Sequence, residues 1–219
     1  WGPDMGTATG TQTPRSGWIW SDPSGTALVR PDGGAHNFIE WVDPRDWAGF
    51  DVKGNNDNST ILQSAIDEAA YKSRSELGFS ASKRLLLPMG RIAFGTQLLI
   101  RQNSWVEGIF GADGGTELRW VGADGTDAIA NVAGIELSSC HLSNLRIKDF
   151  RTTPTSGRGI SFKDFNNGVS LRRLQVFGFP LEQIYVGADV GQAGDCTELD
   201  DIWIGGTAAT AKGILLERL

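Results

Sequence analysis

Apolar residues recur at regular spacing through the second half of the chain. An apolar-x-x-apolar-x-apolar motif occurs three times, its members 29 and then 28 residues apart: Leu142, Leu145 and Ile147; Leu171, Leu174 and Val176; Leu199, Ile202 and Ile204. A shorter motif of two apolar residues flanking one other residue begins at Ile135, Ile160, Ile184 and Ile214. Its spacings are 25, 24 and 30 residues. Repeats of this length, with short strands and no helical pattern between them, predict a solenoid.

The spacings favour an all-β fold, a parallel β-helix. Each turn would direct its alternating apolar residues into a central column, with the next turn stacked about 4.8 Å above it. Propeller blades of about 40 residues match the spacings less well. The register also predicts three rows of outward side chains on one face: Asn144, Arg173 and Asp201; Arg146, Gln175 and Trp203; Lys148, Phe177 and Gly205.

One amphipathic helix is predicted near residue 60. Thr60 and Gln63 fit a capping box, with Asn58 and Ser59 as competing caps. The apolar residues that follow fall on one helical face: Ile61, Leu62, Ala65, Ile66 and Ala69. Because a solenoid has an apolar end that must be covered, we expect this helix to close the amino-terminal end.

Residues 1–45 differ from the rest, since they contain four of the eight Trp residues and no periodic pattern. We interpret them as an irregular, aromatic-rich leader and residues 46–219 as the capped solenoid, truncated at its carboxy-terminal end. Two interpretations of the leader stay open: a flexible segment, or an attachment element whose aromatic side chains contact a partner chain. Trp18 and Trp20, in a strand-like triplet, are the candidates for attachment to a virion.

Residues 48–110 resemble the amino-terminal cap and first coils of the pectate-lyase-like right-handed β-helix superfamily. The residues that carry the resemblance are Gly54, Asp57, Asn58, Thr60, Gln63, Ala65, Ile66, Pro88 and Gly90, followed by Asn103 and Gly108. Asn58 stands where the family more often has a second Asp, and the glycines are displaced. The remaining chain matches through its repeats alone. The resemblance implies a right-handed parallel β-helix, and in the tailspike members of the superfamily a homotrimer.

The resemblance and the aromatic leader together favour a bacteriophage tailspike or receptor-binding protein, located in the virion tail. Its amino-terminal part would dock to phage tail proteins, and its β-helix would bind host surface polysaccharide. Whether it also depolymerises the polysaccharide stays open. Two alternatives remain: a secreted, extracellular and monomeric polysaccharide lyase or glycoside hydrolase, and a non-catalytic structural virion adaptor.

Charge and hydropathy argue against several classes of partner. The formal net charge of -6 disfavours nucleic acid, because the chain repels phosphate backbones. No apolar run approaches the roughly 20 residues that span a bilayer, so membrane insertion is not expected. His36 and His141 are isolated in the sequence, and we predict no metal and no cofactor. Cys140 and Cys196 are expected to be free thiols, because two turns of the solenoid would separate them.

The outward rows supply the candidate carbohydrate-binding residues: Arg146, Arg173, Phe177, Asp201 and Trp203. Flat apolar rings pack against pyranose rings, and forked guanidinium donors bind hydroxyl or uronic carboxylate groups. The alternative is a solvated or subunit-packed face on which Arg173 pairs with Asp201.

Catalysis of glycoside hydrolysis would require two carboxyl groups about 5 to 9.5 Å apart. The densest acidic cluster of the repeat region contains four candidates for acid or base: Asp195, Glu198, Asp200 and Asp201. The alternative is that these acidic turn residues keep the solenoid soluble.

Overall fold

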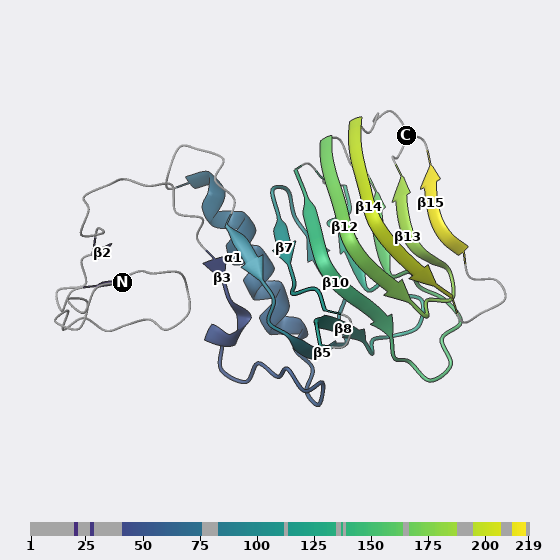
Figure 1. Ribbon diagram of the computed structural model, residues 1–219, viewed down its shortest axis with the longest axis horizontal. Helices are drawn as coiled ribbons and strands as arrows, with labels where there is room; N and C mark the ends of the chain where they lie inside the picture. Colours follow the sequence, from purple (N-terminus) through teal and green to yellow (C-terminus); the bar gives the residue numbers. More distant parts are fainter. Residues whose placement is uncertain are drawn as a thin grey trace.

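The computed structural model describes residues 20–21, 27–28, 41–75, 83–111, 114–134, 137, 139–163, 167–187, 195–206 and 212–217. The fold is mostly β, a parallel β-solenoid of about four turns with one helix near its amino end (Figure 1). The predicted fold class is therefore confirmed. The predicted attachment residue Trp18 lies outside the described residues, and the side chain of Trp20 is not described. Within the described part, no helix is long and apolar enough to cross a membrane.

Two parallel sheets form the walls of the solenoid. The first sheet contains, in spatial order, β14 (Asp195–Gly205), β12 (Asn167–Phe177), β10 (His141–Asp149), β7 (Trp105–Glu107), β4 (Arg84–Leu86) and β3 (Trp41–Val42), while β8 (Thr116–Trp120) joins β10 to β5 (Gly90–Phe94). The second sheet runs β15 (Lys212–Glu217), β13 (Glu182–Gly187), β11 (Ile160–Lys163), β9 (Ile129–Asn131) and β6 (Leu98–Ile100). A separate antiparallel pair is formed by β1 (Trp20–Ser21) and β2 (Ala27–Leu28).

The strands β3 and β4 bear on where the solenoid begins. Trp41 and Val42 pair in parallel with Arg84 and Leu85, and Val42 is buried in the core. A short 3-10 helix (Pro44–Asp46) follows β3. The predicted division at residue 45 stays a prediction, but hydrogen bonding to the solenoid is already present four residues before it.

The register of both sheets confirms the first repeat motif in full and the second in its last three copies. Leu145 lies beside Leu174, and Leu174 lies beside Ile202. In the second sheet, Ile160, Ile184 and Ile214 are adjacent in the same way. The members of these columns that lie between two other turns are fully buried.

One copy of the second motif was assigned wrongly. The strand that pairs with Ile160 is β9, which places Ile129 in the position that the motif assigned to Ile135. All three residues of β9 are buried, and Asn131 is accommodated because the backbone N–H of Lys163 donates to its Oδ1 at 2.7 Å. Leu137 is buried in the core as well.

The apolar-x-x-apolar spacing has a structural cause in a bend of the first sheet. Asn144, Arg173 and Asp201 have positive φ angles of 58, 49 and 52°. Their flanking residues pair in register, since Ser143 lies beside Arg172 and Leu145 beside Leu174, so the three bend residues occupy equivalent positions on successive turns. The left-handed conformation inserts one residue between two inward-facing side chains and turns the sheet toward a new face.

The helix α1 (Ser59–Ser75) lies against the first turn and covers the amino-terminal end of the solenoid, as predicted (Figure 1). Leu62, Ala65, Ile66 and Ala69 are buried in the common core, whereas Ile61 is only half-buried. Of the proposed caps, Asn58 occupies the N-cap position, because its backbone carbonyl accepts from the N–H of Leu62 at 2.9 Å, but its side-chain Oδ1 accepts from the N–H of Asp51 at 2.8 Å.

The predicted Thr60–Gln63 capping box is wrong, because the helix begins at Ser59 and the side chain of Gln63 forms its hydrogen bonds with the edge of the second sheet. Gln63 Nε2 donates to the carbonyl of Leu99 at 3.1 Å, and the N–H of Leu99 donates to Gln63 Oε1 at 2.8 Å. The side-chain amide thus takes the place of a neighbouring strand beside β6. At the helix start, Ser59 Oγ accepts from the N–H groups of Gly95 and Thr96 at 2.9 and 2.8 Å.

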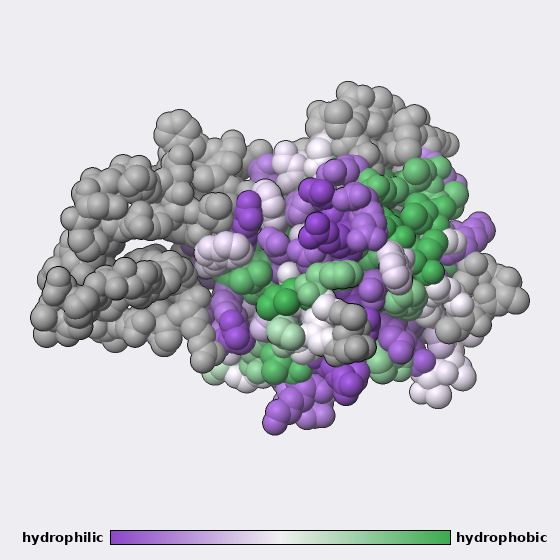
Figure 2. Space-filling view, in the orientation of Figure 1, coloured by the Kyte–Doolittle hydropathy of each residue, from purple (hydrophilic) through white to green (hydrophobic). Residues whose placement is uncertain are grey.

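The last turn differs from those before it in exposure. The inward-facing residues Ile204, Ile214 and Leu216 are 38 to 42% exposed, because no described strand stacks on β14 and β15. Figure 2 shows hydrophobic side chains gathered at this end, over β13 and β15. The two ends of the described solenoid are therefore unlike: one is covered by α1 and the other presents its apolar column.

Carboxylates also tie the connections between strands together. Asp124 accepts from the Thr155 hydroxyl, from the Ser156 N–H at 3.0 Å and from the Thr155 N–H at 3.1 Å. The Thr155 hydroxyl hydrogen bond, and after it the Ser156 N–H, lower the pKa of Asp124 from 3.8 to about 2. The N–H of Lys53 is the largest cause that lowers the pKa of Asp51. Burial would raise the pKa of Glu182, but the hydrogen bond from Arg158 and its other partners outweigh it, so this pKa is lowered too.

These lowered pKa values predict destabilisation by acid. A carboxyl group whose pKa is lower in the folded state stabilises the fold fully above its unfolded pKa, and this contribution is lost as the pH falls through its folded pKa. The contribution of these carboxyl groups to the urea midpoint should therefore be complete above about pH 4.5, the ordinary value for Glu182, and be lost progressively toward pH 2, near the pKa of Asp124. Asp124→Asn should flatten the most acidic part of this curve. A midpoint that does not change over this range would contradict the assignment.

Candidate functional site

The candidate site is the outward surface that follows the bend on four strands of the first sheet. One row contains Glu117, Arg146, Gln175 and Trp203, and the next contains Arg119, Lys148, Phe177 and Gly205, on β8, β10, β12 and β14 respectively. We call these two sets the outer rows. Their register is the one predicted, and it brings the candidate residues Arg146, Phe177 and Trp203 onto one surface.

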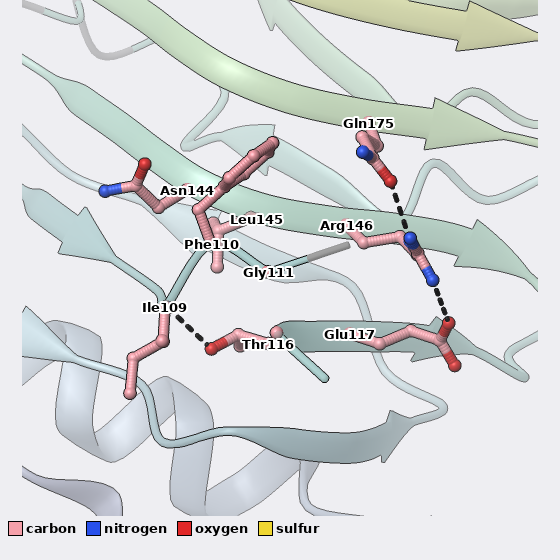
Figure 3. Close-up of a pocket in the computed structure, with 10 residues that line it drawn as sticks. Ile109, Phe110, Gly111, Thr116, Glu117, Asn144, Leu145, Arg146 and Gln175 are labelled. Atoms are coloured by element: carbon pink, nitrogen blue, oxygen red, sulfur yellow. Dashed lines mark hydrogen bonds and ion pairs between the residues drawn. The ribbon is translucent and has the colours of Figure 1, made fainter. Parts of the chain in front are cut away.

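Planar polar groups are fixed along the first of the outer rows (Figure 3). Arg146 Nε donates to Gln175 Oε1 at 2.8 Å, and Arg146 Nη1 lies 3.6 Å from Glu117 Oε2. Arg119 Nε binds the same carboxylate at 2.6 Å. The side chains of three successive turns are thereby held in fixed positions by one another.

Aromatic rings form the other half of the surface. Trp203 is 60% exposed, and its indole N–H donates to Asp201 Oδ1 at 2.9 Å, which fixes the orientation of the ring. Phe177 is half-buried and lies over Gly205, where an added Cβ would come within 2.8 Å of the ring. Phe150 lies next to the cations of the outer rows, with the Arg119 guanidinium 4.2 Å and the Lys148 ammonium 4.8 Å from its ring centroid.

A shallow hollow adjoins Arg146 where the connection between β7 and β8 lies against β10 (Figure 3). It encloses about 260 Å³, part of which is open solvent, and is lined by Phe110, Asn144, Leu145 and Arg146 among others. Asn144 Nδ2 donates to Glu107 Oε1 at 3.1 Å, while its buried Oδ1 has no hydrogen-bond partner in the described part of the chain. The periodic pattern did not identify Phe110 or Phe150, because both lie in connections between strands.

The predicted alternative of an Arg173–Asp201 ion pair is not observed among the described residues. Both residues belong to the bend, and Asp201 accepts from Trp203 instead. Arg172, one position earlier, forms the ion pairs: its Nη2 lies 3.1 Å from Asp200 Oδ2 and its Nε 3.8 Å from Glu198 Oε1.

The acidic candidates for catalysis are engaged in contacts that stabilise the last turns. Glu198 accepts from the Ser170 hydroxyl at 2.7 Å and pairs with Arg172, as does Asp200. The side chain of Asp195 lies outside the described part of the chain. A catalytic role for Asp195, Glu198, Asp200 or Asp201 stays a prediction.

The remaining titratable candidates have structural surroundings. His141 is half-buried, its ring 4.5 Å from that of Trp105, and burial is the largest cause that lowers its pKa. Cys140 is a free thiol, as predicted, and burial raises its pKa. The side chain of Cys196 is not described. Among the residues that the structure describes, no three His, Cys, Asp or Glu residues are grouped so that they could hold a metal ion.

Comparison with known proteins gives one structural similarity. No family model matches the chain, and no curated protein matches it. A chain of known structure, ORF18 of Geobacillus virus E2, is similar at a TM-score of 0.49 and 13% sequence identity. The similarity covers 78% of this chain and 39% of that one, so this chain spans about two fifths of the length of the viral protein.

Proposed function

We propose that this chain is part of a bacteriophage tailspike or receptor-binding protein whose solenoid binds host surface polysaccharide through the outer rows. The observation that carries the proposal is the exposed Trp203, held by Asp201 beside Phe177 and next to the row of Arg146 and Gln175. Ring faces for sugar rings and fixed donors for hydroxyl groups lie together on one rigid wall.

The rigidity of the wall favours binding of an extended polymer. Each strand of the outer rows is hydrogen-bonded to its neighbours on the solenoid, and the guanidinium and amide groups are already held in place by one another. Binding therefore costs little ordering of the protein. A polysaccharide lying across successive turns would meet one outward position of each row on every turn, about 4.8 Å apart.

The phage assignment is supported by the amino-terminal cap. Two residues that carry the resemblance to the superfamily join α1 to the first turn here: Asn58, at the start of α1, donates to the carbonyl of Ala93, and Gln63 binds the edge of β6. With the resemblance come a homotrimer, docking to phage tail proteins, for which Trp18 and Trp20 are the candidates, and a location in the virion. Sedimentation equilibrium of the full chain tests the assembly: a trimer supports the tailspike, and a monomer favours the secreted lyase or hydrolase.

Cleavage of the bound polysaccharide is the part of the proposal that requires its own test. Incubation with host capsule or lipopolysaccharide, followed by assays for reducing ends and unsaturated uronates, separates a depolymerase from a binding protein. Release of either product would support a role for the acidic cluster on β14. Absence of both products, with binding retained, favours the non-catalytic virion adaptor.

Trp203→Ala should weaken binding of host surface polysaccharide by at least about tenfold, because an exposed, oriented Trp is the type of residue that carries binding energy. Affinity electrophoresis in gels that contain the polysaccharide measures the change. The matched control is Tyr185→Ala, which removes a half-buried aromatic ring from the second sheet. Equal effects of the two variants would contradict the proposal.

A further inference from the structure

The outer rows carry an excess of positive charge on a chain whose formal net charge is -6. The first row extends toward the amino end, because Arg91 on β5 pairs with Glu117, and Lys53 forms a bridge to Arg91. The cations of the extended rows are Lys53, Arg91, Arg119, Arg146 and Lys148. In the described part of these rows, Glu117 is the one carboxylate.

Like charges lie side by side within the rows, and the carboxylates next to them are shared or accept other donors. Arg119 and Lys148 lie directly beside each other on adjacent strands, an arrangement that destabilises a sheet when the charges are alike. Glu117 is shared between two guanidinium groups, those of Arg119 and Arg146. Asp51, the carboxylate next to Lys53, accepts three backbone N–H groups of its own turn, including that of Asn55 at 2.6 Å. A bound anion would relieve this repulsion.

We propose that the outer rows bind an anionic polysaccharide, one whose sugars carry carboxylate, sulfate or phosphate groups. The acidic groups would lie over the cations of β5, β8 and β10, where the forked guanidinium groups favour paired oxygens. The sugar rings would continue onto Phe177 and Trp203 of β12 and β14. This inference rests on the proposed function and specifies its ligand.

A polysaccharide fits the surface better than a nucleic acid does. Single-stranded nucleic acid requires aromatic rings to stack its bases and a basic groove that follows its phosphates past those rings. Here the aromatic end of the surface adjoins carboxylates, since Asp200 and Asp201 precede Trp203 on β14 and both are exposed. A polymer with more widely spaced charges can place uncharged sugars at this end.

The test is binding of the full chain to a panel of probes by affinity electrophoresis. The panel contains hyaluronan, an anionic polysaccharide in which uncharged sugars alternate with charged ones, polygalacturonate and dextran sulfate as densely charged polysaccharides, dextran as the neutral one, and single-stranded poly-dT. We expect binding to one or more anionic polysaccharides that weakens with salt, as screening predicts.

The double variant Arg91→Gln, Lys148→Gln should lower this binding by about tenfold or more. Lys163→Gln, Lys212→Gln on the second sheet makes the same change in net charge and should bind as the unchanged chain does. Circular dichroism of each variant checks its fold.

Four results would overturn the inference, in different ways. Binding only to dextran or to a neutral host glycan, weakened by Trp203→Ala, would refute the anionic ligand and leave the proposed function intact. If poly-dT bound more tightly than every anionic polysaccharide, the ligand of the outer rows would be a nucleic acid and not a sugar polymer. Equal loss in the two double variants, or no binding to any anionic polysaccharide, would remove the assigned role of the rows. The proposed function itself fails only if host polysaccharide is not bound either.

Discussion

Arg151→Met is expected to lower the free energy of unfolding by about 3 to 5 kcal/mol, the usual cost of removing one partner from a buried ion pair. The side chains of Asp149 and Arg151 are 1 and 8% exposed, and Arg151 Nη2 lies 2.6 Å from Asp149 Oδ2. Arg151 also donates to the carbonyl groups of Ser156 and Ala123 at 3.0 and 3.2 Å. Without the guanidinium, the buried Asp149 carboxylate keeps the backbone N–H of residue 151 as a donor but loses its opposite charge, and two carbonyl groups lose a side-chain donor. Urea unfolding followed by circular dichroism measures the loss.

The matched control is Arg172→Met, which removes an exposed guanidinium from Asp200 and Glu198. Exposed pairs contribute about 0 to 1 kcal/mol, so this variant should unfold near the midpoint of the unchanged chain. Equal losses for the two variants would show that the Arg151–Asp149 pair does not have the buried character described above.

Leu174→Ala is expected to cost about 2 to 5 kcal/mol, the range for Leu to Ala changes that leave a cavity in a packed core. Leu174 is fully buried, with Leu145 on the turn before it and Ile202 on the turn after it. Because the turns above and below hold their positions, the space left by the side chain cannot collapse easily. The same urea experiment measures the change.

Leu199→Ala provides the comparison, since it makes the same chemical change on the last strand of the sheet. Leu199 is half-buried and has a neighbour from the column, Leu171, on one side. Its substitution should therefore cost clearly less than that of Leu174. The reverse order would mean that Leu174 does not lie between two turns.

The stacked turns could be predicted because the inward-facing apolar residues repeat from turn to turn. Ile129–Asn131 was missed because this strand combines one large apolar residue with a small and a polar one, and the polar side chain is satisfied by the backbone of the next turn. The position of α1 at the amino-terminal end could be predicted, but the contacts of its first turn could not. Gln63 has a capping position in sequence, yet its partner is a strand edge 36 residues away.

The candidate surface could be predicted where its residues follow the alternation of inward and outward side chains along the strands. Arg146, Phe177 and Trp203 lie where alternation places them. The sequence could not distinguish the roles of Arg172 and Arg173, because the bend that separates them depends on a positive φ at a residue type that rarely adopts one. Phe110 and Phe150 lie in connections between strands, where no regular alternation of inward and outward residues indicates which side chains reach the surface.

Hydroxyl-radical footprinting of the aromatic side chains, with and without host capsular polysaccharide, tests the binding surface most directly. Our account predicts that Trp203 and Phe177 become protected from oxidation when the polysaccharide binds, while Tyr185 on the second sheet reacts at an unchanged rate. Protection of Tyr185 with continued oxidation of Trp203 would contradict it.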